Sequence, residues 1–566
     1  MLRKVRRSVL SRIDPLGWGP ATASVALRAA MNPLGVVRAN ASLAANLARI
    51  PLSAATMYTG GQVEPPLPVD ARDKRFADPA WSQNPGYMAL RQYYLAVAKY
   101  VDDMLEAGHG DPLTDGKVKQ MSDLMLGALA PTSFVATNPD ALVEAYRTGG
   151  RSLAKGARFA ASDMVTRGGR PVKVDTKAYT LGEDMACTPG QVVFRNDLIE
   201  VMQYEPQTKT VYETPLLVTP PWINKYYILD LRPGRSLVEM AIKTGRTVFA
   251  ISYRNPDGSM RDLGMDDYYL QGTSAALDVV QEITGAEKVD ILALCLGGAM
   301  TAMAAAKDAQ DGVDRLGSLT LLNAMLDYSE PGELSLMTDG AAIEMIEERM
   351  SRKGYLSQKD MSDPFDMIRA NDLIFNYWVS RWMKGEEPTA FDILVWNDDS
   401  TKMPARMHSE YLRGMYRDNL LCKGEFVLDG TTLDLSQVTS DCYVVGAIGD
   451  HIVPWSTSYK AVALLGGDVR YVQSNGGHLA GAVNPPSSRT WFKAIGKPQD
   501  DNREAYPATA AEFEEVAEKH TGDSWWTDWN TWMSSRAGKK VAPPAMGSEA
   551  HPPLYPAPGK YVKNAR

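Results

Sequence analysis

The segment from Lys288 to Ala299, KVDILALCLGGA, constrains the fold of this chain more than any other. An apolar run containing β-branched residues ends at Leu294, a single cysteine follows, and a glycine pair leads into a helix-favouring stretch rich in alanine and methionine. A strand that turns sharply into a helix needs small residues at the turn, because the two backbones approach closely there. The arrangement predicts that Cys295 is a nucleophile at a helix N-terminus, where unpaired N–H groups favour a thiolate.

Two observations limit this interpretation of the segment. Free cysteines are usually buried, so Cys295 could instead be a structural residue in front of the helix. In addition, Ala293 stands where the motif G-x-S/C-x-G has its first glycine. The extra methyl group is small, and we expect it to strain the turn without excluding it.

The composition is that of a globular protein, since 45% of the 566 residues are hydrophobic and 23% are charged. A chain of this length is expected to form two or three domains. The four cysteines include no CxxC pair, which argues against a disulfide framework or a metal site and favours a reducing compartment. We find no P-loop, no HExxH and no GxGxxG after a strand, and no apolar run of the roughly 18 residues that a membrane helix needs.

Positive charge is concentrated at the start of the chain. Residues 1–63 carry eight Lys or Arg residues and one acidic residue, so this segment has a charge of +7 while the remainder has −15. We predict a basic N-terminal arm over residues 1–65, which either binds an anionic or amphiphilic surface or is a solvated, partly disordered segment. It does not resemble a secretory signal, because polar and turn-forming residues interrupt any apolar core. The acidic remainder gives no support for nucleic-acid binding.

Hydrophobic periodicity divides the rest of the chain. Apolar residues recur at three- and four-residue spacing between about Gly86 and Arg167, which predicts a mostly helical domain over residues 66–190. Strands then alternate with helices, first in an antiparallel portion and afterwards in a largely parallel sheet. Together with the strand–turn–helix segment this is an α/β-hydrolase pattern, and we predict such a catalytic domain over residues 191–566. Alternation stops between residues 325 and 438, where we predict a lid insertion, and the proline-rich tail is predicted to be irregular.

A cysteine nucleophile needs a base, and the base needs an acceptor that orients it. In an α/β-hydrolase these groups follow one another along the chain as nucleophile, acid and histidine. Cys295, Asp450 at the end of one strand, and His478 after the next strand fit this order. His451 is a competing base, but it precedes the final strand. Asp441 is a weaker candidate for the acid, because it opens its strand.

Backbone N–H groups should complete the site as an oxyanion hole. This fold combines the N–H that follows the nucleophile with one from the loop after an earlier strand, here Leu216–Val218. We therefore expect Leu296 to supply one donor and Ile223 the other, with Trp222 as the alternative, because two prolines leave few free N–H groups in that loop. A thiol exchanges with thioesters at little thermodynamic cost, so these residues point to acyl transfer. The remaining histidines are predicted to be surface residues: His109, His408, His520 and His551.

Many separate stretches of the chain resemble one family, the polyhydroxyalkanoate synthases of the long, single-subunit type. The resemblance extends over about residues 82–562 and includes the Cys295 segment. Its other stretches are TPPWINKYYILDL (219–231), SYRNPD (252–257), DDYY (266–269), NDLIFNYW (371–378), FDILVWNDDST (391–401), GDHIVPW (449–455), GGHLAGAVNPP (476–486), SWWTDW (524–529) and APGKYV (557–562).

The resemblance implies roles for the candidate residues. Cys295 would carry the acyl chain and His478 would be the general base, while Asp450 would either orient the histidine or activate the substrate hydroxyl. Asp230 falls on a position important in the family, although it could equally be a helix-capping residue. The implied reaction polymerises (3R)-hydroxyacyl-CoA thioesters into a polyester and releases CoA. No cofactor is expected, because coenzyme A is part of the substrate and a product.

The resemblance also implies a setting for the protein. Family members act as dimers on polymer granules in the cytoplasm, with the helical N-terminal region implicated in granule and partner contacts. We accordingly expect a cytoplasmic homodimer at the granule surface. The first alternative is an esterase or depolymerase of the same fold, with water as the acceptor. The second is a non-catalytic granule-coat protein that works through its basic arm.

Overall fold

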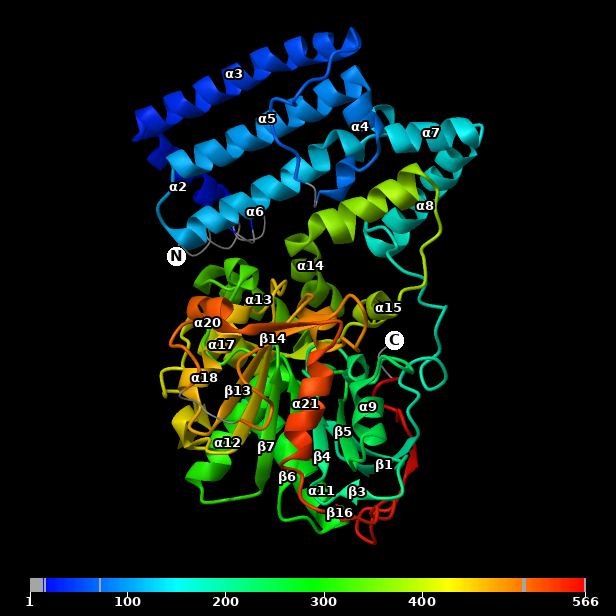
Figure 1. Cartoon of the computed structure of the whole chain (residues 1–566), viewed down its shortest axis with the longest axis vertical. Coiled ribbons are helices and arrows are strands. Elements are labelled where there is room, and N and C mark those ends of the chain that lie inside the picture. Colours follow the sequence, from blue (N-terminus) through cyan, green and yellow to red (C-terminus); the bar gives the residue numbers. More distant parts are fainter. Residues whose placement is uncertain (1–13, 15–16, 71–72, 501–504, 564–566) are drawn as a thin grey trace. The chain divides into compact units, whose positions relative to one another are not determined.

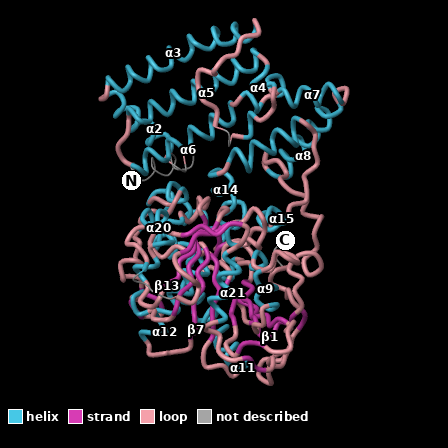
Figure 2. The backbone as a smooth tube through the Cα atoms, viewed as in Figure 1, coloured by secondary structure: helices cyan, strands magenta, loops and turns pink. Residues whose placement is uncertain are grey.

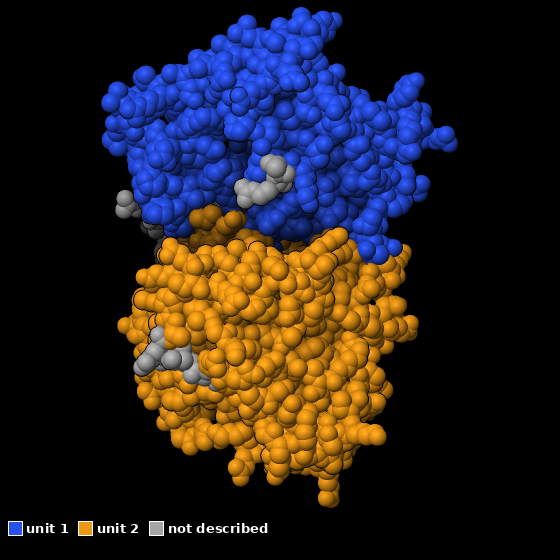
Figure 3. Space-filling model, viewed as in Figure 1, with its two compact units in different colours: residues 1–175, 363–390 blue, residues 176–362, 391–566 orange. Residues whose placement is uncertain are grey.

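The computed structural model describes residue 14 and residues 17–70, 73–500 and 505–563. The chain forms two compact units, which Figure 3 shows in different colours. Unit 1 holds residues 1–175 and 363–390, and unit 2 holds residues 176–362 and 391–566. Helices make up the first unit, while the strands gather in the second (Figure 2). Within the described ranges, no helix combines the length and the apolar character needed to cross a membrane.

The helices of unit 1 share a sequence signature at their starts. Four of them begin with Asn or Asp followed by proline, and in each case the Asn or Asp side chain accepts a hydrogen bond from a backbone N–H of the first turn. Proline suits the first helical position because its fixed φ matches the helix and no N–H is lost. The helices are α2 (Trp18–Ala30), α3 (Pro33–Tyr58), α4 (Ala80–Gln83), α5 (Pro85–Ala107), α6 (Pro112–Leu129), α7 (Pro139–Arg147) and α8 (Arg151–Arg167).

The described part of the predicted basic arm is folded. It forms α2 and α3, and α3 packs along α5 through Ile50 and Ala96. Arg28 of α2 forms an ion pair with Asp115 and donates a hydrogen bond to the Gly108 carbonyl oxygen at 2.7 Å. These residues therefore belong to the helical unit. The other basic residues at the very start lie outside the described residues: Arg3, Lys4, Arg6, Arg7 and Arg12.

Part of the segment predicted as a lid belongs to unit 1. Residues 363–390 include two π-helical turns, η8 (Asn371–Phe375) and η9 (Trp378–Met383). The Arg381 guanidinium donates to the buried Asp163 carboxylate of α8 at 2.7 Å, and the Trp382 indole N–H donates to the same carboxylate at 2.8 Å. The predicted boundaries kept residues 325–438 together in the catalytic domain, whereas the compact units divide this stretch because Asp163 anchors its middle to α8.

Unit 2 is organised around a mixed sheet, which has eleven strands within the described residues (Figure 1). Six neighbouring strands are parallel, in the order β5-β4-β6-β7-β12-β13, and antiparallel strands flank them on both sides. The strands are β1 (Gly190–Arg195), β2 (Ile199–Tyr204), β4 (Leu216–Thr219), β5 (Val248–Tyr253), β6 (Val289–Leu294), β7 (Leu316–Leu322), β12 (Asp441–Ala447), β13 (Val469–Ser474), β14 (Trp491–Ala494), β15 (Glu518–Thr521) and β17 (Tyr555–Pro556).

Helices enclose this sheet, and every residue of β6 and β13 is buried, as expected for parallel strands covered on two faces. The predicted order of strands and helices is confirmed from β1 to β13. The helices that matter below are α9 (Leu237–Lys243), α12 (Leu296–Gln310), α15 (Asp392–Asp398), α16 (Ala405–Tyr411), α19 (His478–Ala482) and α21 (Trp525–Ser534).

The proline-rich tail is largely irregular, as predicted, but it packs against unit 2 and contributes one short strand. Its β17 pairs antiparallel with β1, placing Tyr555 opposite Val192. The buried Glu200 carboxylate accepts hydrogen bonds from the Tyr555 hydroxyl at 2.6 Å and from the Tyr561 N–H at 3.0 Å. A buried carboxylate on β2 thus holds residues 555–561 in place, a feature that their local sequence does not encode.

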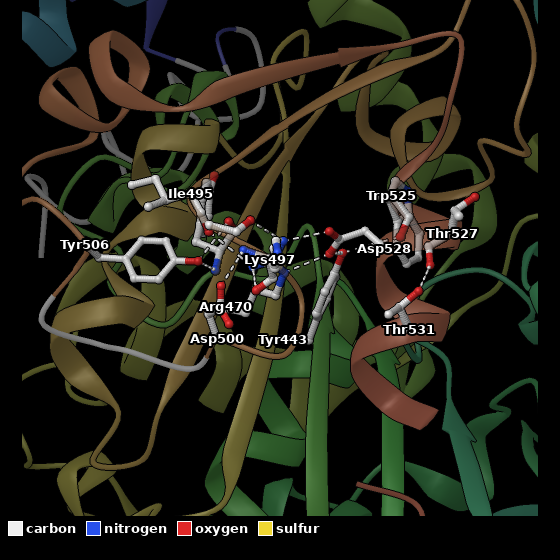
Figure 4. Close-up of polar contacts among 12 residues, drawn as sticks. Tyr443, Arg470, Ile495, Lys497, Asp500, Tyr506, Trp525, Thr527, Asp528 and Thr531 are labelled. Carbon is white, nitrogen blue, oxygen red and sulfur yellow. Dashed lines mark hydrogen bonds and ion pairs between the residues drawn. The ribbon is translucent and has the colours of Figure 1, made fainter. Parts of the chain in front are cut away.

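A buried ion pair joins α21 to the sheet (Figure 4). The Arg470 guanidinium on β13 donates to both oxygens of Asp528 on α21, at 2.8 and 2.6 Å. The same group donates to the Lys497 carbonyl oxygen at 2.9 Å, and the Tyr443 hydroxyl donates to Asp528 at 2.8 Å. The ion pair of Arg470 and Asp528 therefore holds a helix, two strands and the loop after β14 together.

Replacing Arg470 with methionine should destabilise unit 2 by about 3–5 kcal/mol, because Asp528 would stay buried without its cation. The loss is measured as a shift in urea unfolding followed by tryptophan fluorescence, with Arg470→Lys as the charge-conserving control. A change below about 1 kcal/mol, the size typical of an exposed pair, would contradict the structural role.

Another buried carboxylate, Asp290 on β6, gives the stability a pH dependence. Burial raises the pKa of Asp290 to about 6, although hydrogen bonds from Ser318 and the positive charge of Arg246 pull it down in part. The folded protein then holds this proton more tightly than the unfolded chain, so stability falls as pH rises from about 4 to about 6. Above about pH 6 the folded protein carries the full free-energy cost of burying the ionised Asp290 carboxylate, about 3 kcal/mol.

The variant Asp290→Asn lacks this titration. Its stability relative to the native protein should rise by about 3 kcal/mol between pH 4 and pH 7, measured by urea unfolding at both values. If the difference in unfolding free energy between the two proteins does not change with pH, Asp290 ionises normally.

Candidate active site

Cys295 occupies a strained turn between β6 and α12. Its φ of 53° and ψ of −119° lie outside the regions that non-glycine residues usually adopt. The Cys295 N–H donates to the Leu322 carbonyl oxygen of β7 at 2.8 Å, which ties the turn to the neighbouring strand. The side chain is half-buried. This is the geometry predicted for a nucleophile that projects from the carboxyl end of a parallel sheet.

The glycine pair after the cysteine is required by close packing. A β-carbon at Gly297 would lie 2.5 Å from the Thr219 carbonyl oxygen and 2.7 Å from that of Pro220. A β-carbon at Gly298 would lie 2.5 Å from the Ala324 methyl carbon. Ala293, where the motif has glycine, is a fully buried β6 residue opposite Thr219, so its methyl group is accommodated in the sheet before the turn begins.

His478 and Asp450 meet beside this turn. His478 begins α19 after β13, and its Nδ1 lies 2.6 Å from Oδ2 of Asp450, which follows β12. The other carboxylate oxygen, Oδ1, accepts hydrogen bonds from the N–H groups of Ile452 and Val453 at 2.8 and 2.9 Å. The carboxylate is therefore held from both sides, with one oxygen reserved for the histidine.

The third member of the predicted triad is close enough to interact with this pair. Burial by itself lowers the pKa of His478, but Asp450 and the Cys295 sulfur, which also forms a hydrogen bond with the ring, raise it well above its usual value. A raised pKa means that the histidine readily takes a proton from the thiol. The structure thus brings Cys295, Asp450 and His478 together, while their chemical roles stay predictions.

The alternative candidates were His451 for the base and Asp441 for the acid. His478 makes a hydrogen bond to Asp450 at 2.6 Å. Asp441 opens β12 at the opposite end of the strand, where its carboxylate forms an ion pair with Arg536 at 2.9 Å. The structure therefore favours the acid and base that chain order selected.

The predicted oxyanion donors flank the turn. Leu296 is the first residue of α12, where backbone N–H groups have no partner within the helix. Ile223 lies in the loop after β4, and the start of that loop rests against Gly297 through the Thr219 and Pro220 carbonyl groups. Both positions suit an oxyanion hole, and the donor roles stay predictions.

A group of tyrosines faces the nucleophile. Tyr328, Tyr411 and Tyr416 come from the segment that interrupts the sheet, and their ring centroids lie 5.0 to 6.4 Å apart. Burial raises the pKa of each hydroxyl, and electrostatic interaction with Cys295 raises it further, which places all three near the sulfur. Sequence reasoning did not identify these rings, because the segment shows no regular pattern.

His408 of α16 was predicted to be a surface residue, and this is wrong. It is buried in the same segment, with its ring 6.1 Å from that of Tyr411. Burial lowers the pKa of His408 to about 4, so the ring is neutral at physiological pH. The segment packs around this neutral histidine as part of the wall behind the tyrosines.

Asp230 lies in a separate buried cluster. Its Oδ1 accepts hydrogen bonds from the Thr188 hydroxyl at 2.5 Å and from the Ser236 hydroxyl at 2.7 Å, and Ser236 caps the N-terminus of α9. Burial raises the pKa of Asp230. These contacts make Asp230 a support for a helix cap, and its importance for catalysis stays a prediction.

Comparison with known proteins agrees with this architecture. Residues 72–241 match the family described as "Poly-beta-hydroxybutyrate polymerase (PhaC) N-terminus", and residues 234–485 match the alpha/beta hydrolase fold. The chain is 39% identical over 515 residues to the poly(3-hydroxyalkanoate) polymerase of Methylorubrum extorquens, covering 90% of this chain and 84% of that protein. It belongs to the poly(3-hydroxyalkanoate) polymerase family.

Other family members are similarly related. Poly(3-hydroxyalkanoate) polymerase 2 of Ectopseudomonas oleovorans is 37% identical over 525 residues, covering 91% of this chain and 92% of its own. The PhaC subunit of the polymerase of Cupriavidus necator is 36% identical over 498 residues, which cover 87% of this chain and 83% of that protein. The resemblance inferred from the sequence is therefore confirmed, and so is the α/β-hydrolase fold with its helical N-terminal region.

Proposed function

We propose that this protein is an acyltransferase that polymerises (3R)-hydroxyacyl-CoA thioesters into polyhydroxyalkanoate and releases CoA. The observation that carries the proposal is the hydrogen-bonded set of Cys295, His478 and Asp450 at the strained turn, in a chain that belongs to the polymerase family. The reaction needs no resident cofactor, because the thioester substrate supplies the activated acyl group.

Acylation of the enzyme begins at the thiol. His478 accepts the Cys295 proton, and the thiolate attacks the thioester carbonyl carbon of the substrate. The negative charge that develops on the carbonyl oxygen is met by the N–H groups of Leu296 and Ile223. The carbon–sulfur bond to CoA then breaks, and the CoA thiolate takes the proton from His478, which leaves an acyl group on Cys295.

Chain growth repeats this chemistry with a hydroxyl group as the nucleophile. His478, oriented by Asp450, accepts the hydroxyl proton of a second hydroxyacyl unit, and the alkoxide attacks the acyl group on Cys295 to form one new ester bond. The displaced Cys295 thiolate is then ready for another substrate. Tyr328, Tyr411 and Tyr416 lie near the sulfur, and in this proposal their apolar rings keep water from the acyl-enzyme, which separates a polymerase from a hydrolase.

The direct test is to incubate the purified protein with (R)-3-hydroxybutyryl-CoA. The proposal expects free CoA together with an insoluble polyester. Free CoA together with free 3-hydroxybutyrate would instead identify a hydrolase, and no CoA release at all would favour a non-catalytic coat protein. The family relationship also supports a cytoplasmic homodimer at the polyester granule surface. Light scattering before and after substrate addition would detect the dimer and its association with polymer.

A further inference from the structure

The loop after β4, which carries the candidate oxyanion donor Ile223, is held by a distant part of the chain. The Trp396 indole N–H donates to the Lys225 carbonyl oxygen at 2.7 Å, and the Asn224 N–H donates to the Thr401 hydroxyl at 2.8 Å. Trp396 and Thr401 belong to residues 391–401, the first residues of unit 2 after the excursion of the chain into unit 1. The loop conformation thus depends on a segment more than 170 residues away along the chain.

A buried ion pair reinforces this attachment. The Lys225 ammonium donates to both oxygens of Asp399 at 2.8 Å and to the Val562 carbonyl oxygen at 2.6 Å, which accounts for its three N–H groups. Only 5% of the Lys225 side chain and 2% of the Asp399 side chain are exposed. The Tyr227 hydroxyl adds a hydrogen bond to Asp399 at 3.0 Å. Burying two charges is costly, and only such complete pairing offsets it.

The backbone of the loop after β4 shows how the Lys225–Asp399 ion pair could affect the candidate donor Ile223. Asn224 has a φ of 64°, in the left-handed region that asparagine adopts more readily than most side-chain-bearing residues. Asn224 lies between Ile223 and Lys225, so this left-handed residue, which its hydrogen bond to Thr401 holds in place, is next to the candidate donor. The other end of the loop rests on Gly297 without room for a methyl group. An oxyanion donor acts only if its N–H is aimed correctly within a few tenths of an ångström.

We propose that Lys225 and Asp399 are positioning residues, which lock the loop after β4 so that the Ile223 N–H points at the oxyanion. The inference rests on the proposed acyl-transfer function. The Val562 carbonyl completes the lock, so the end of the chain and the segment returning from unit 1 become part of the active-site scaffold. Neither touches the reacting atoms.

The test compares two reactions of Cys295 that differ in their need for an oxyanion hole. Release of CoA from (R)-3-hydroxybutyryl-CoA in a single turnover passes through an oxyanion, whereas alkylation of the thiolate by iodoacetamide does not. In Lys225→Met and in Asp399→Asn, CoA release should fall by about 100-fold, the size of a lost oxyanion donor. The rate of alkylation should not change.

Arg470→Met is the matched control, because it breaks a buried ion pair in the same unit that does not touch the loop. All rates are normalised to the folded fraction. The proposal is overturned if CoA release in the lock variants falls no further than in Arg470→Met, or if alkylation falls by the same factor as CoA release. If Lys225→Met does not fold, Asp399→Asn and Tyr227→Phe decide, and unchanged CoA release in both rejects the lock.

The two proposals fail in different ways in this experiment. If the native protein is alkylated at Cys295 but releases no CoA from the thioester, the proposed acyl-transfer function is wrong. If the native protein releases CoA and only the lock variants behave like the control, the function stands and the positioning role is wrong.

Discussion

Replacing Cys295 with alanine should lower CoA release from (R)-3-hydroxybutyryl-CoA by about 10⁴-fold or more, the effect of removing a covalent nucleophile. His478 interacts with the sulfur, and Asp450 holds His478, so neither group takes over as the nucleophile when the sulfur is removed. Initial rates of CoA release, followed with a reagent that does not modify cysteine, measure the effect. Mass spectrometry after a brief reaction should find the acyl group on the native protein alone.

Cys422→Ala is the matched control for this experiment. Cys422 is also a half-buried free thiol, and burial raises its pKa, which makes it a poor nucleophile. The variant should keep native activity. If Cys295→Ala still releases CoA, or if Cys422→Ala does not, Cys295 is not the nucleophile.

Replacing Asp450 with asparagine should lower kcat by about 10⁴-fold through a change in the histidine tautomer, as for other acids that orient a catalytic imidazole. In the native site Oδ1 accepts two backbone N–H bonds and Oδ2 faces Nδ1 of His478. The asparagine oxygen must keep the two N–H groups, so its NH₂ group would face the ring. Nδ1 would then have to accept a bond, Nε2 would carry the proton, and the ring could not receive a proton from Cys295.

The matched control is Asp441→Asn, which removes an acid at the other end of the same strand, where it pairs with Arg536. It should retain native activity. A loss of less than about tenfold in Asp450→Asn would mean that the histidine does not depend on this carboxylate.

The same variant distinguishes the two roles that the family resemblance allows for Asp450. If the acid orients His478, the first release of CoA in a single turnover falls together with polymer formation. If the acid instead activates the substrate hydroxyl, the first release of CoA is preserved and only chain growth is lost. Quenched-flow measurement of the first turnover separates these outcomes.

Much of the active site could be predicted because its chemistry depends on local pattern and chain order. The strand, the cysteine and the glycine pair lie within twelve residues, and the glycines are needed because Gly297 approaches the Thr219 and Pro220 carbonyl groups. The acid and the histidine follow successive strands, and the carboxyl ends of parallel strands lie at one edge of a sheet. Meeting of Asp450 and His478 was therefore expected from the topology.

Other features could not be predicted, because they come from contacts between segments that carry no shared pattern. Tyr411 ends the short helix α16 and Tyr416 lies in the π-helical turn that follows it, and only the folded segment shows that both lie near Cys295. The wrong prediction for His408 has the same origin, since a lone histidine in an unpatterned stretch gives no sign of burial. Likewise, nothing near Lys225 in the sequence indicates Asp399 as its partner.

The sequence by itself predicted the candidate nucleophile and determined the succession of strands and helices and the family, because each depends on short-range spacing or on residue order. Only the tertiary structure decided which side chains surround the sulfur, how residues 363–390 leave the catalytic unit, and what holds the loop of Ile223. The physical reason is that burial, ion pairing and close packing act between residues that are neighbours in space. Lys225 and Asp399 are 174 positions apart in the chain and 2.8 Å apart in the fold.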